Sequence, residues 1–399
     1  MIVGKNEALF ERLSEPSEWI LYRNAQKEEF TMINKERLLS TFLDYIQIDS
    51  ESTHEAAAAA RIAEDLKAIG CEVTFDNSQD KTGSDTGNLY ATLPGNADGE
   101  AILFSAHMDT VTPGNGIEPV IEDGIIRSKG NTILGGDDKS GVVAVVEALR
   151  TIVEKNLPHP TIQAVFTVCE EIGLKGSSAL DYSKISAKRA IVLDSGGDAG
   201  SITVAAPGQY KLNATVTGRR AHAGVAPEEG ISAIQVLCEA VANMKLLRID
   251  EETTANIGTI RSEFATNIVA ETAVLIGEAR SRNDEKLEVQ ARHMMDCLKN
   301  ACEKYGATLD AALTKAYGAY SYTAEDAIVK AVVTACEKVG LDAKLGASGG
   351  GSDANNFNAI GIQAVNLGTG MAKVHTTNEE ISIENLENTA ALVLALAAQ

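Results

Sequence analysis

The sequence predicts an α/β protein in which a mixed-sheet domain, sandwiched by helices, carries an inserted, smaller α+β domain. Helical and strand patterns alternate from residue 32 to about residue 207, and again from about residue 321 onward. Between these segments, near Pro207-Gly208, the pattern changes to alternating strands and two helices. The length of 399 residues also exceeds what one ordinary hydrophobic core supports, which favours two domains.

The first part of the chain is expected to alternate helices with strands. Helices are expected at 34–47 and 54–69, where the alanine run Ala56–Ala60 has high intrinsic helix propensity. Apolar residues at helical spacing predict a third helix at 139–155. The expected strands are 72–75, 88–93, 101–104, 161–168 and 190–193, with a weaker candidate directly before Asp137.

The inserted segment begins with a strand in which Tyr210, Leu212, Ala214 and Val216 alternate with polar residues. The next expected elements are a helix at 231–247, strands at 256–262 and 268–277, a helix at 284–304 and a strand at 307–315. The α/β pattern then resumes with a helix at 324–339, a strand at 362–367 and a helix at 384–398. The predicted domains are therefore 32–207 plus 321–399, and 208–320, preceded by an N-terminal extension at 1–31.

Charge and cysteine content exclude several classes of protein. The chain has 35 Lys and Arg against 56 Asp and Glu, a net charge of −21, whereas nucleic acids and anionic membranes require a basic surface. No apolar stretch is long enough to cross a bilayer, and Met1–Thr31 lacks the features of a signal peptide. The six cysteines form no C-x-x-C pair and are expected to be buried free thiols. We therefore expect a cytoplasmic protein.

Acidic residues and histidines gather where the expected strands end. Ligands of open α/β sheets bind in the crevice beyond the carboxyl ends of the strands, and histidines with carboxylates are typical ligands of divalent metals. The sequence therefore predicts a hydrolase with two metal ions. The five clusters are Ser105-Ala106-His107-Met108-Asp109, Gly136-Asp137-Asp138-Lys139, Cys169-Glu170-Glu171, Leu193-Asp194-Ser195 and Val374-His375-Thr376.

Each cluster taken alone has a simpler explanation. A single strand-end histidine such as His107 is usually a surface residue, Asp137 would cap the helix that follows it, and Asp194 would fit a turn. Adjacent side chains of an extended strand point to opposite sides, so Glu170 and Glu171 would divide their roles, one binding metal and the other activating water. All five clusters together favour the metal site.

The combined pattern resembles the co-catalytic zinc peptidase family that contains peptidase T, carboxypeptidase G2, succinyl-diaminopimelate desuccinylase and aminoacylase. The resemblance covers about residues 33–399, and the peptidase T branch is the most similar. Aspartate rather than glutamate at position 194 goes with the aminopeptidase and dipeptidase members. The matching motifs, in the family's order, are H-x-D (His107, Asp109), G-x-D-D-K-x-G (Asp137), E-E (Glu170, Glu171), Asp194 and the late His375.

The resemblance implies a centre with two Zn²⁺ ions per subunit, for which Co²⁺ or Mn²⁺ are possible substitutes. Asp109 would orient the imidazole of His107, and Glu170 would be the general base. The implied metal ligands are Asp137, which would bridge both ions, His107 and Asp194 at one ion, and Glu171 and His375 at the other.

The resemblance also implies substrate contacts. His222, in an Arg-Ala-His-Ala-Gly motif, would stabilise the oxyanion of the scissile carbonyl. Asn267 and Arg280 would hold the far end of the substrate, with Arg280 binding a carboxylate, although a surface arginine is the simpler interpretation and Arg282 is close by. Gly350 would contribute a backbone contact.

The expected function is hydrolysis of short peptides, with release of the N-terminal residue of tripeptides, by metal-activated water and Glu170 as base. One alternative is an amidohydrolase acting on dipeptides or N-acyl amino acids. Another is a metal-binding scaffold without catalysis, against which the intact Glu170 argues. A phosphate-binding loop at Gly349–Ser352 is disfavoured, because the segment has neither the G-x-x-x-x-G-K-[ST] spacing nor a lysine. The expected partners are a short peptide and a second copy of the chain, joined through the inserted domain as lid and dimerisation unit.

Overall fold

The computed structural model describes residues 32–398, which divide into two compact units. The first unit runs to Val204 and adds Tyr322–Gly346 and the residues from Ser352 onward. The second unit comprises Ala205–Ser321 together with Ala347–Gly351. The glycine-rich segment at 347–351 therefore lies with the second unit, outside the 208–320 range expected for the insert.

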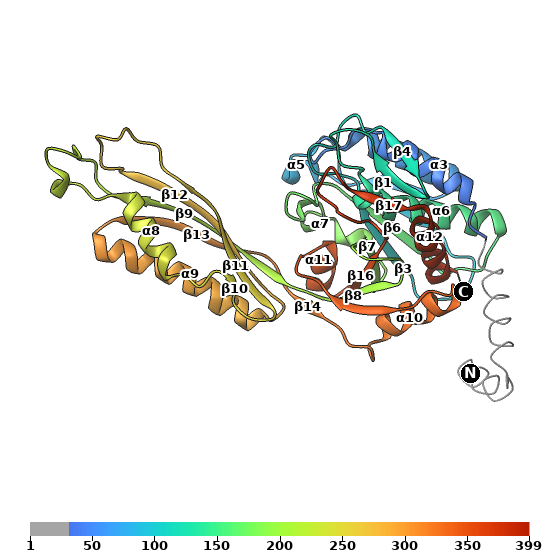
Figure 1. Ribbon diagram of the computed structural model, residues 1–399. Helices are drawn as coiled ribbons and strands as arrows, with labels where there is room; N and C mark the ends of the chain where they lie inside the picture. The colour runs from blue at the N-terminus through green and yellow to red at the C-terminus, as the bar shows by residue number, and fades with distance from the viewer. Residues whose placement is uncertain (1–31, 399) are drawn as a thin grey trace. The chain divides into compact units, whose positions relative to one another are not determined.

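The first unit is built on a mixed nine-stranded sheet, of which β14 and the last residues of β8 and β15 fall within the bounds of the second unit (Figure 1). Its order is β1-β2-β6-β3-β7-β16-β8-β14, with β15 paired to β8. Strands β6, β3, β7 and β16 are mutually parallel neighbours, and the pairs β1–β2 and β2–β6 are antiparallel. The strands are β1 (Glu72–Phe75), β2 (Leu89–Leu93), β3 (Ile102–His107), β6 (Ile162–Thr167), β7 (Arg189–Ser195), β8 (Ser201–Ala206), β14 (Tyr320–Ser321), β15 (Lys344–Ala347) and β16 (Gln363–Gly368).

Helices cover both faces of this sheet, with α6 and α12 packed together on one face and α7 and α11 on the other (Figure 1). A separate three-stranded sheet has the order β17-β5-β4. The helices of the first unit are α3 (Lys35–Ile46), α4 (Ala56–Ile69), α5 (Gln79–Thr82), α6 (Gly136–Lys155), α7 (Lys175–Ser178), α10 (Ala327–Lys338), α11 (Asp353–Ala359) and α12 (Ile383–Ala397), and the small strands are β4 (Pro119–Glu122), β5 (Ile125–Ser128) and β17 (Glu380–Ser382).

Burial explains why these segments take these forms. Strands β3 and β6 are buried along nearly their whole length, as expected for parallel strands covered on both faces. Helix α6 lies in the interior, and all but four of its residues are buried. Helix α4 ends where Gly70 adopts a left-handed conformation with φ of 103°, which glycine tolerates without steric cost.

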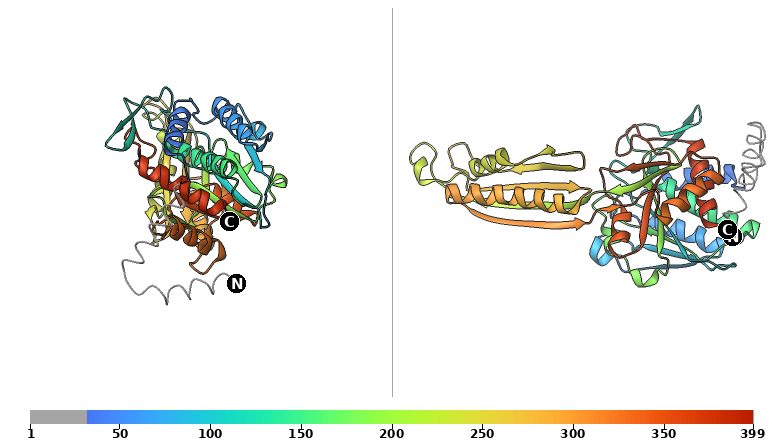
Figure 2. Two further views of the ribbon diagram at one scale, coloured as in Figure 1. Left: turned by 90° about the vertical axis from the view of Figure 1, so that its right-hand side faces the viewer. Right: turned by 90° about the horizontal axis from the view of Figure 1, so that it is seen from below.

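The second unit is a five-stranded antiparallel sheet with α8 and α9 side by side on one face (Figures 1 and 2). Leu212, Ala214 and Val216 of β9 are buried in its core with residues of both helices. The strand order is β10-β11-β12-β9-β13. The elements are β9 (Gly208–Thr217), α8 (Ala233–Asn243), β10 (Leu247–Arg248), β11 (Thr253–Arg261), β12 (Thr272–Ser281), α9 (Asp284–Tyr305) and β13 (Thr308–Tyr317).

The predicted fold class is confirmed, and two smaller expectations are wrong. The residues directly before Asp137 form no strand, because Gly135 turns the backbone with φ of 72° and the neighbouring amides bind a side chain instead of a strand. All six cysteines are free, but Cys238 is exposed, since it lies on the solvent side of α8. The predicted extension at 1–31 lies outside the described residues.

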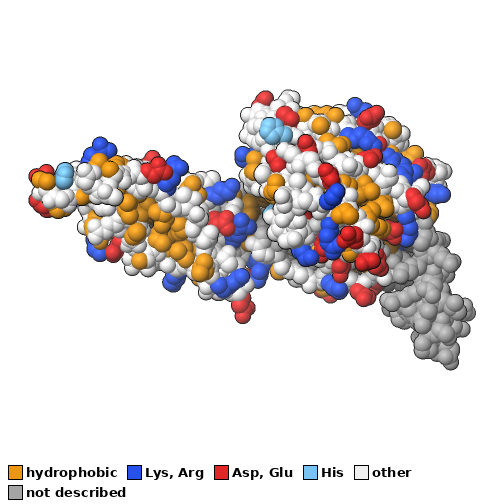
Figure 3. Space-filling view, turned by 45° about the horizontal axis from the view of Figure 1, so that its top comes forward, with side chains coloured by type: hydrophobic (Ala, Val, Ile, Leu, Met, Phe, Trp, Pro, Cys, Tyr) orange, Lys and Arg blue, Asp and Glu red, His pale blue; other side chains and the backbone are white. Residues whose placement is uncertain are grey.

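The surface charges and the helices can be compared with what the composition predicts. On the face shown in Figure 3, acidic and basic side chains are interspersed over both units. Among residues 32–398, no helix combines the length and the apolar character that crossing a membrane requires.

Candidate metal centre

Three neighbouring parallel strands bring the first clusters together. His107 is the last residue of β3, Glu170 follows the end of β6, and Asp194 is the next-to-last residue of β7. The sheet order places β6, β3 and β7 side by side, so their carboxyl ends meet at one edge. Asp137 reaches this edge from the start of α6, where its φ and ψ of −82° and 103° are not helical.

Asp137 lies between the two histidines. Its Oδ1 is 3.0 Å from His107 Nε2, and its Oδ2 is 3.3 Å from His375 Nε2. His375 Nε2 also lies 2.9 Å from Glu171 Oε2, and His107 Nε2 lies 3.9 Å from Asp194 Oδ1. One carboxylate thus faces two histidines, each of which has a further carboxylate beside it.

Ligand atoms of these side chains converge closely enough to share metal ions. Atoms of His107, Glu170 and Asp194 lie within 4.8 Å of one another, and so do atoms of His107, Asp137 and Glu171. The structure therefore brings together the five residues expected to bind metal and the expected base.

The two adjacent glutamates differ in their contacts. The carboxylate of Glu171 meets His375, at 3.0 Å from Oε1 and 2.9 Å from Oε2. The carboxylate of Glu170, which is buried, makes no hydrogen bond or ion pair with any residue from 32 to 398. The left-handed conformation of Cys169, with φ of 52°, turns the chain just before the pair. Glu170 is therefore the member of the pair whose oxygens remain available for a proton.

Buried carboxylates hold the backbone that carries the glutamate pair. Asp109 Oδ1 accepts the N–H of Glu170 at 2.9 Å, and Asp109 Oδ2 accepts the N–H of Glu171 at 3.2 Å. Glu55 Oε1 accepts the N–H of Cys169 at 3.0 Å. Two carboxylates thus fix three successive backbone amides. These bonds set the orientation of the backbone that carries Glu170 and Glu171.

Asp109 also touches the imidazole of His107, but mainly through its main chain. His107 Nδ1 is 2.9 Å from the carbonyl oxygen of Asp109 and 3.5 Å from its Oδ1. A hydrogen bond from Nδ1–H to this carbonyl directs Nε2 toward Asp137. Loss of the Nε2 proton would then leave the tautomer that a metal ligand requires.

The histidines and carboxylates shift one another's pKa values. Burial lowers the pKa of His107, but hydrogen bonds to Asp109 and Asp137 outweigh it and raise this pKa well above its usual value. Hydrogen bonds to Asp137 and Glu171 raise the pKa of His375 to about 10. Burial opposes ionisation of Asp137, yet contact with both histidines lowers its pKa.

The remaining carboxyl groups lack such compensation. Burial and the negative charge of Asp194 raise the pKa of Glu170 well above its usual range. Burial and the charge of Asp137 do the same for Asp194. Lys139 is fully buried nearby, where its Nζ donates to Ser50 Oγ at 2.6 Å, and burial lowers its pKa to about 8.

This donor set fits divalent cations. Four buried or half-buried carboxyl groups crowd two imidazoles, so negative charge exceeds positive charge at the centre. Nitrogen and oxygen ligands of this kind suit Zn²⁺, Co²⁺ and Mn²⁺, and a bound cation would relieve the repulsion that raises the carboxyl pKa values.

The expected substrate-contacting residues belong to the second unit and fall into two groups. His222 and Asn267 are exposed and lie together, since His222 pairs with Ile268 in an isolated bridge. Arg280, near the end of β12, donates from Nε to Glu278 Oε1 at 2.8 Å. Its Nη1 lies 3.9 Å from where a Cβ on Gly350 would stand, so Gly350 lies beside it.

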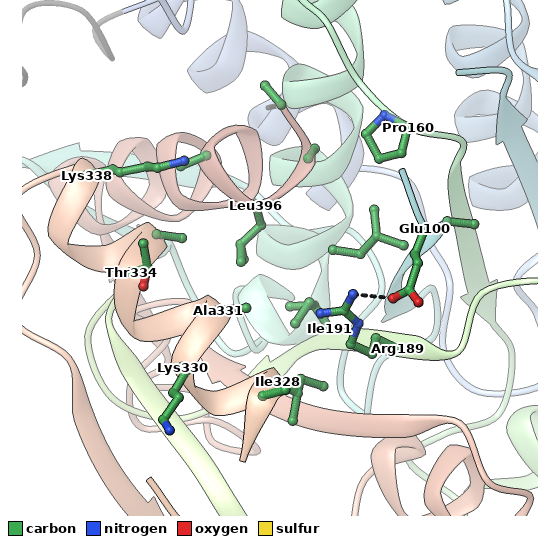
Figure 4. Close-up of a pocket in the computed structure, with 17 residues that line it drawn as sticks. Glu100, Pro160, Arg189, Ile191, Ile328, Lys330, Ala331, Thr334, Lys338 and Leu396 are labelled. Carbon is green, nitrogen blue, oxygen red and sulfur yellow. Dashed lines mark hydrogen bonds and ion pairs between the residues drawn. The ribbon is translucent and has the colours of Figure 1, made fainter. Parts of the chain in front are cut away.

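A cavity of about 600 Å³ lies elsewhere in the first unit, between α10, the end of α12 and the first residues of β3 and β7 (Figure 4). None of the expected site residues lines it. It meets the amino ends of β3 and β7, opposite the metal centre at their carboxyl ends, so it is not the catalytic site.

Sequence reasoning missed two buried carboxylates of the centre, Glu55 and Glu379. Glu55 supports Cys169, as described above, and Glu379 binds the amides of Leu134, Gly135 and Asp137. Glu55 directly precedes the alanine run of the helix expected at 54–69, and Glu379 occurs in a short polar stretch that looks like a surface loop. The only sequence signal for Glu379 is its position four residues after His375.

A sheet with helices on both faces and a cluster of two histidines and four carboxyl groups at its carboxyl edge defines a metallohydrolase type of site. Comparison with known families agrees. Residues 103–399 match the peptidase family M20/M25/M40, and the chain belongs to this family.

Individual relatives match over nearly the whole chain. The chain is 44% identical over 365 residues to the uncharacterized protein YqjE of Bacillus subtilis, which covers 92% of this chain and 98% of that protein. It is similar to the crystal structure of aminopeptidase PepT from Bacillus cereus, with 46% identity, a TM-score of 0.85 and coverage of 92% and 98%. It is also similar to a tripeptidase structure from Staphylococcus aureus, with 38% identity, a TM-score of 0.88 and the same coverage.

Proposed function

We propose that this protein is a metallo-aminopeptidase that releases the N-terminal residue of short peptides, above all tripeptides, with two Zn²⁺ ions at the centre. The observation that carries the proposal is the carboxylate of Asp137, whose two oxygens face His107 and His375 at 3.0 and 3.3 Å. The similarity to an aminopeptidase and a tripeptidase supports the choice of substrate. The six free cysteines favour a reducing compartment, so a cytoplasmic location is part of the proposal.

The chain's residues would divide the work as follows. Asp137 would bridge two ions, with His107 and Asp194 at one and Glu171 and His375 at the other. Bound ions lower the pKa of a coordinated water and polarise the scissile carbonyl. Glu170 would take the proton of that water and pass it to the leaving amine, a role that fits its buried carboxylate and its raised pKa.

The geometry of the second unit bears on how the substrate is held. Thr272 begins β12 just after the segment that contains Asn267, and Arg280 lies eight residues further along the strand. At about 3.3 Å per residue, Thr272 and Arg280 are about 26 Å apart. His222 and Asn267 lie beyond the Thr272 end of β12, where Thr272 pairs with Thr217. An extended tripeptide spans only about 10 Å. His222 and Arg280 of one chain therefore cannot contact the same tripeptide.

We therefore propose that the protein acts as a homodimer formed through the second unit. Arg280, with Gly350 beside it, would bind the substrate's carboxylate, and Asn267 would act together with His222. The imidazole of His222 would come from the other subunit and stabilise the oxyanion. Glu278 accepts a hydrogen bond from Arg280 Nε at 2.8 Å and is itself held by Gln209, whose Nε2 donates to Glu278 Oε2 at 2.6 Å. These contacts orient the guanidinium of Arg280 and support its proposed role.

The proposal is tested with metal-free protein supplied with Zn²⁺, Co²⁺ or Mn²⁺. Hydrolysis of a tripeptide is compared with hydrolysis of the same tripeptide acetylated at its amino group, of a dipeptide and of an N-acetyl amino acid. We expect metal-dependent release of the N-terminal residue from the free tripeptide only. Faster cleavage of the acylated substrates would replace the aminopeptidase with an amidohydrolase, and no turnover with any metal would leave a binding scaffold.

A further inference from the structure

Glu379 lies four residues after His375 and is almost fully buried, with 2% of its surface exposed. Its Oε2 accepts the backbone N–H groups of Leu134 and Gly135 at 2.8 and 2.9 Å, and its Oε1 accepts that of Asp137 at 2.9 Å. We infer that Glu379 is a positioning residue that fixes Asp137 relative to His375. The inference rests on the proposed function, which makes these two residues ligands of the same metal ion.

Besides Glu379, the loop before Asp137 is held by a hydrogen bond from the N–H of Ile133 to the carbonyl oxygen of Pro113 at 2.9 Å. Residues 133–135 belong to no helix or strand. Gly135 has φ of 72°, a conformation that directs neighbouring amides toward one point. A Cβ on Gly136 would stand 3.2 Å from Glu379 Oε1, so the carboxylate packs directly on this backbone. Glu379 therefore contributes directly to the position of Asp137.

The loop that carries His375 is fixed at the same place. Ala372 and Glu380 close the base of this loop with two backbone hydrogen bonds of 2.9 and 3.0 Å. Within it, the N–H of Glu379 donates to the carbonyl oxygen of Thr376 at 3.1 Å. His375 has φ of 62°, and its side chain is half exposed. Because Glu379 adjoins the closed base, its bonds to 134–137 join the two ligand-bearing segments.

All three hydrogen bonds between Glu379 and the backbone use its oxygens as acceptors. Hydrogen bonds from N–H groups to a carboxylate are directional. Their loss would let Asp137 Oδ2 move from its place 3.3 Å from His375 Nε2. Partners that orient metal ligands in this way are typically worth about 10- to 100-fold in metal affinity or activity.

The test uses Glu379→Gln, with the exposed Glu384→Gln in the first turn of α12 as a matched control. An amide keeps the size of the side chain but turns one acceptor into a donor facing N–H groups. Metal-free proteins are titrated with Co²⁺, and binding is followed by visible absorption and calorimetry. We expect two ions in wild type and control, whereas Glu379→Gln binds one ion about 10- to 100-fold more weakly. Excess Co²⁺ should restore its kcat.

Further measurements separate positioning from a structural role. A purely structural role would lower the melting temperature and leave both affinities unchanged, which would overturn the inference. If Glu379→Gln does not fold, Gly136→Ala displaces the same carboxylate by a few tenths of an ångström and should weaken the same ion. A wild-type protein that binds fewer than two ions overturns the proposed function and this inference with it. Two ions of unchanged affinity in the variants overturn the inference alone.

Discussion

The carboxylate of Asp138 accepts a hydrogen bond from the backbone N–H of His107, with Oδ2 3.2 Å from the amide nitrogen. Its other oxygen accepts the N–H of Gly141 at 3.1 Å. Asp138 therefore joins the end of β3 to the start of α6. Asp137, its neighbour in sequence, instead directs both oxygens at histidines. Adjacent aspartates of one motif thus do different work, one on the backbone and one toward the proposed ions.

This division predicts different outcomes for two alanine variants. Asp137→Ala should lose both metal ions or nearly both, because the proposed bridge serves each of them. Asp138→Ala should keep most of its metal and lose about 1–3 kcal/mol of stability, because buried amides lose their acceptor. Metal analysis and thermal unfolding of both variants test this. Equal metal loss in the two would contradict the assignment of the bridge to Asp137.

Glu170 should be needed for turnover and not for metal binding. Its carboxylate makes no hydrogen bond or ion pair within residues 32–398, whereas that of Glu171 meets His375 at 2.9 Å. Glu170→Gln should keep both ions and reduce kcat by about 10²- to 10⁴-fold, the range typical of a lost general base. Glu171→Gln is the matched control and should lose one ion. Retained activity in Glu170→Gln together with a missing ion would exchange the two roles.

Much of this centre could be predicted because the strands that carry it are recognisable from short stretches of sequence. Strands β3, β6 and β7 are buried apolar runs, and the residues that end or follow them are the ones that bind at an α/β sheet edge. His107, Glu170 and Asp194 could therefore be placed together from the order of residues along the chain. The fold class followed from the same alternation of periodicities.

The remaining features depend on contacts that no local pattern records. Glu379 binds the amide of Asp137 from 242 positions away, and its neighbours in sequence are ordinary polar residues. The three-residue strand β17 pairs with β5, which lies far earlier in the chain, so neither was expected. The left-handed backbone at Cys169 and His375 is likewise imposed by tertiary contacts and is not favoured by these residue types.

Asp76 should make stability depend on acid. It is buried, and its oxygens accept hydrogen bonds of 2.9–3.0 Å from Ser78, Asn88 and Tyr90. Burial opposes ionisation, but these bonds outweigh it and lower the pKa of Asp76 below its usual 3.8. The stabilisation is therefore fully present above pH 3.8 and is lost as pH falls through the lowered value.

We expect wild type to be more stable to unfolding than Asp76→Asn at neutral pH, with a difference that becomes smaller in acid. At pH 7 the variant should be about 1–3 kcal/mol less stable. Below pH 3.8 the difference should shrink. Chemical unfolding with a chelator present, so that metal loss does not contribute, measures it, and the exposed Asp80→Asn of α5 is the control. A gap that stays constant with pH would show that the ionised form of Asp76 is not what stabilises the fold.

His222 should act on the chemistry without holding metal. It is exposed, its Nδ1 accepts the N–H of Gly224 at 3.2 Å, and its side chain belongs to the second unit. His222→Ala should therefore keep both ions and the fold while losing about 10²- to 10³-fold in kcat, as for other lost oxyanion donors. Near-normal kcat would refute this role, and loss of an ion would move His222 into the metal centre.

Mixing variants shows from which subunit His222 acts. If each active site takes Glu170 from one chain and His222 from its partner, a dimer of His222→Ala with Glu170→Gln has one intact site. Random mixing makes half of the dimers mixed, so activity should recover to roughly a quarter of wild type. Size exclusion and exchange of differently tagged chains confirm that mixed dimers form. Because His222 lies beyond the end of β12 that is about 26 Å from Arg280, we expect this recovery. Its absence despite complete exchange would mean that His222 acts within its own chain.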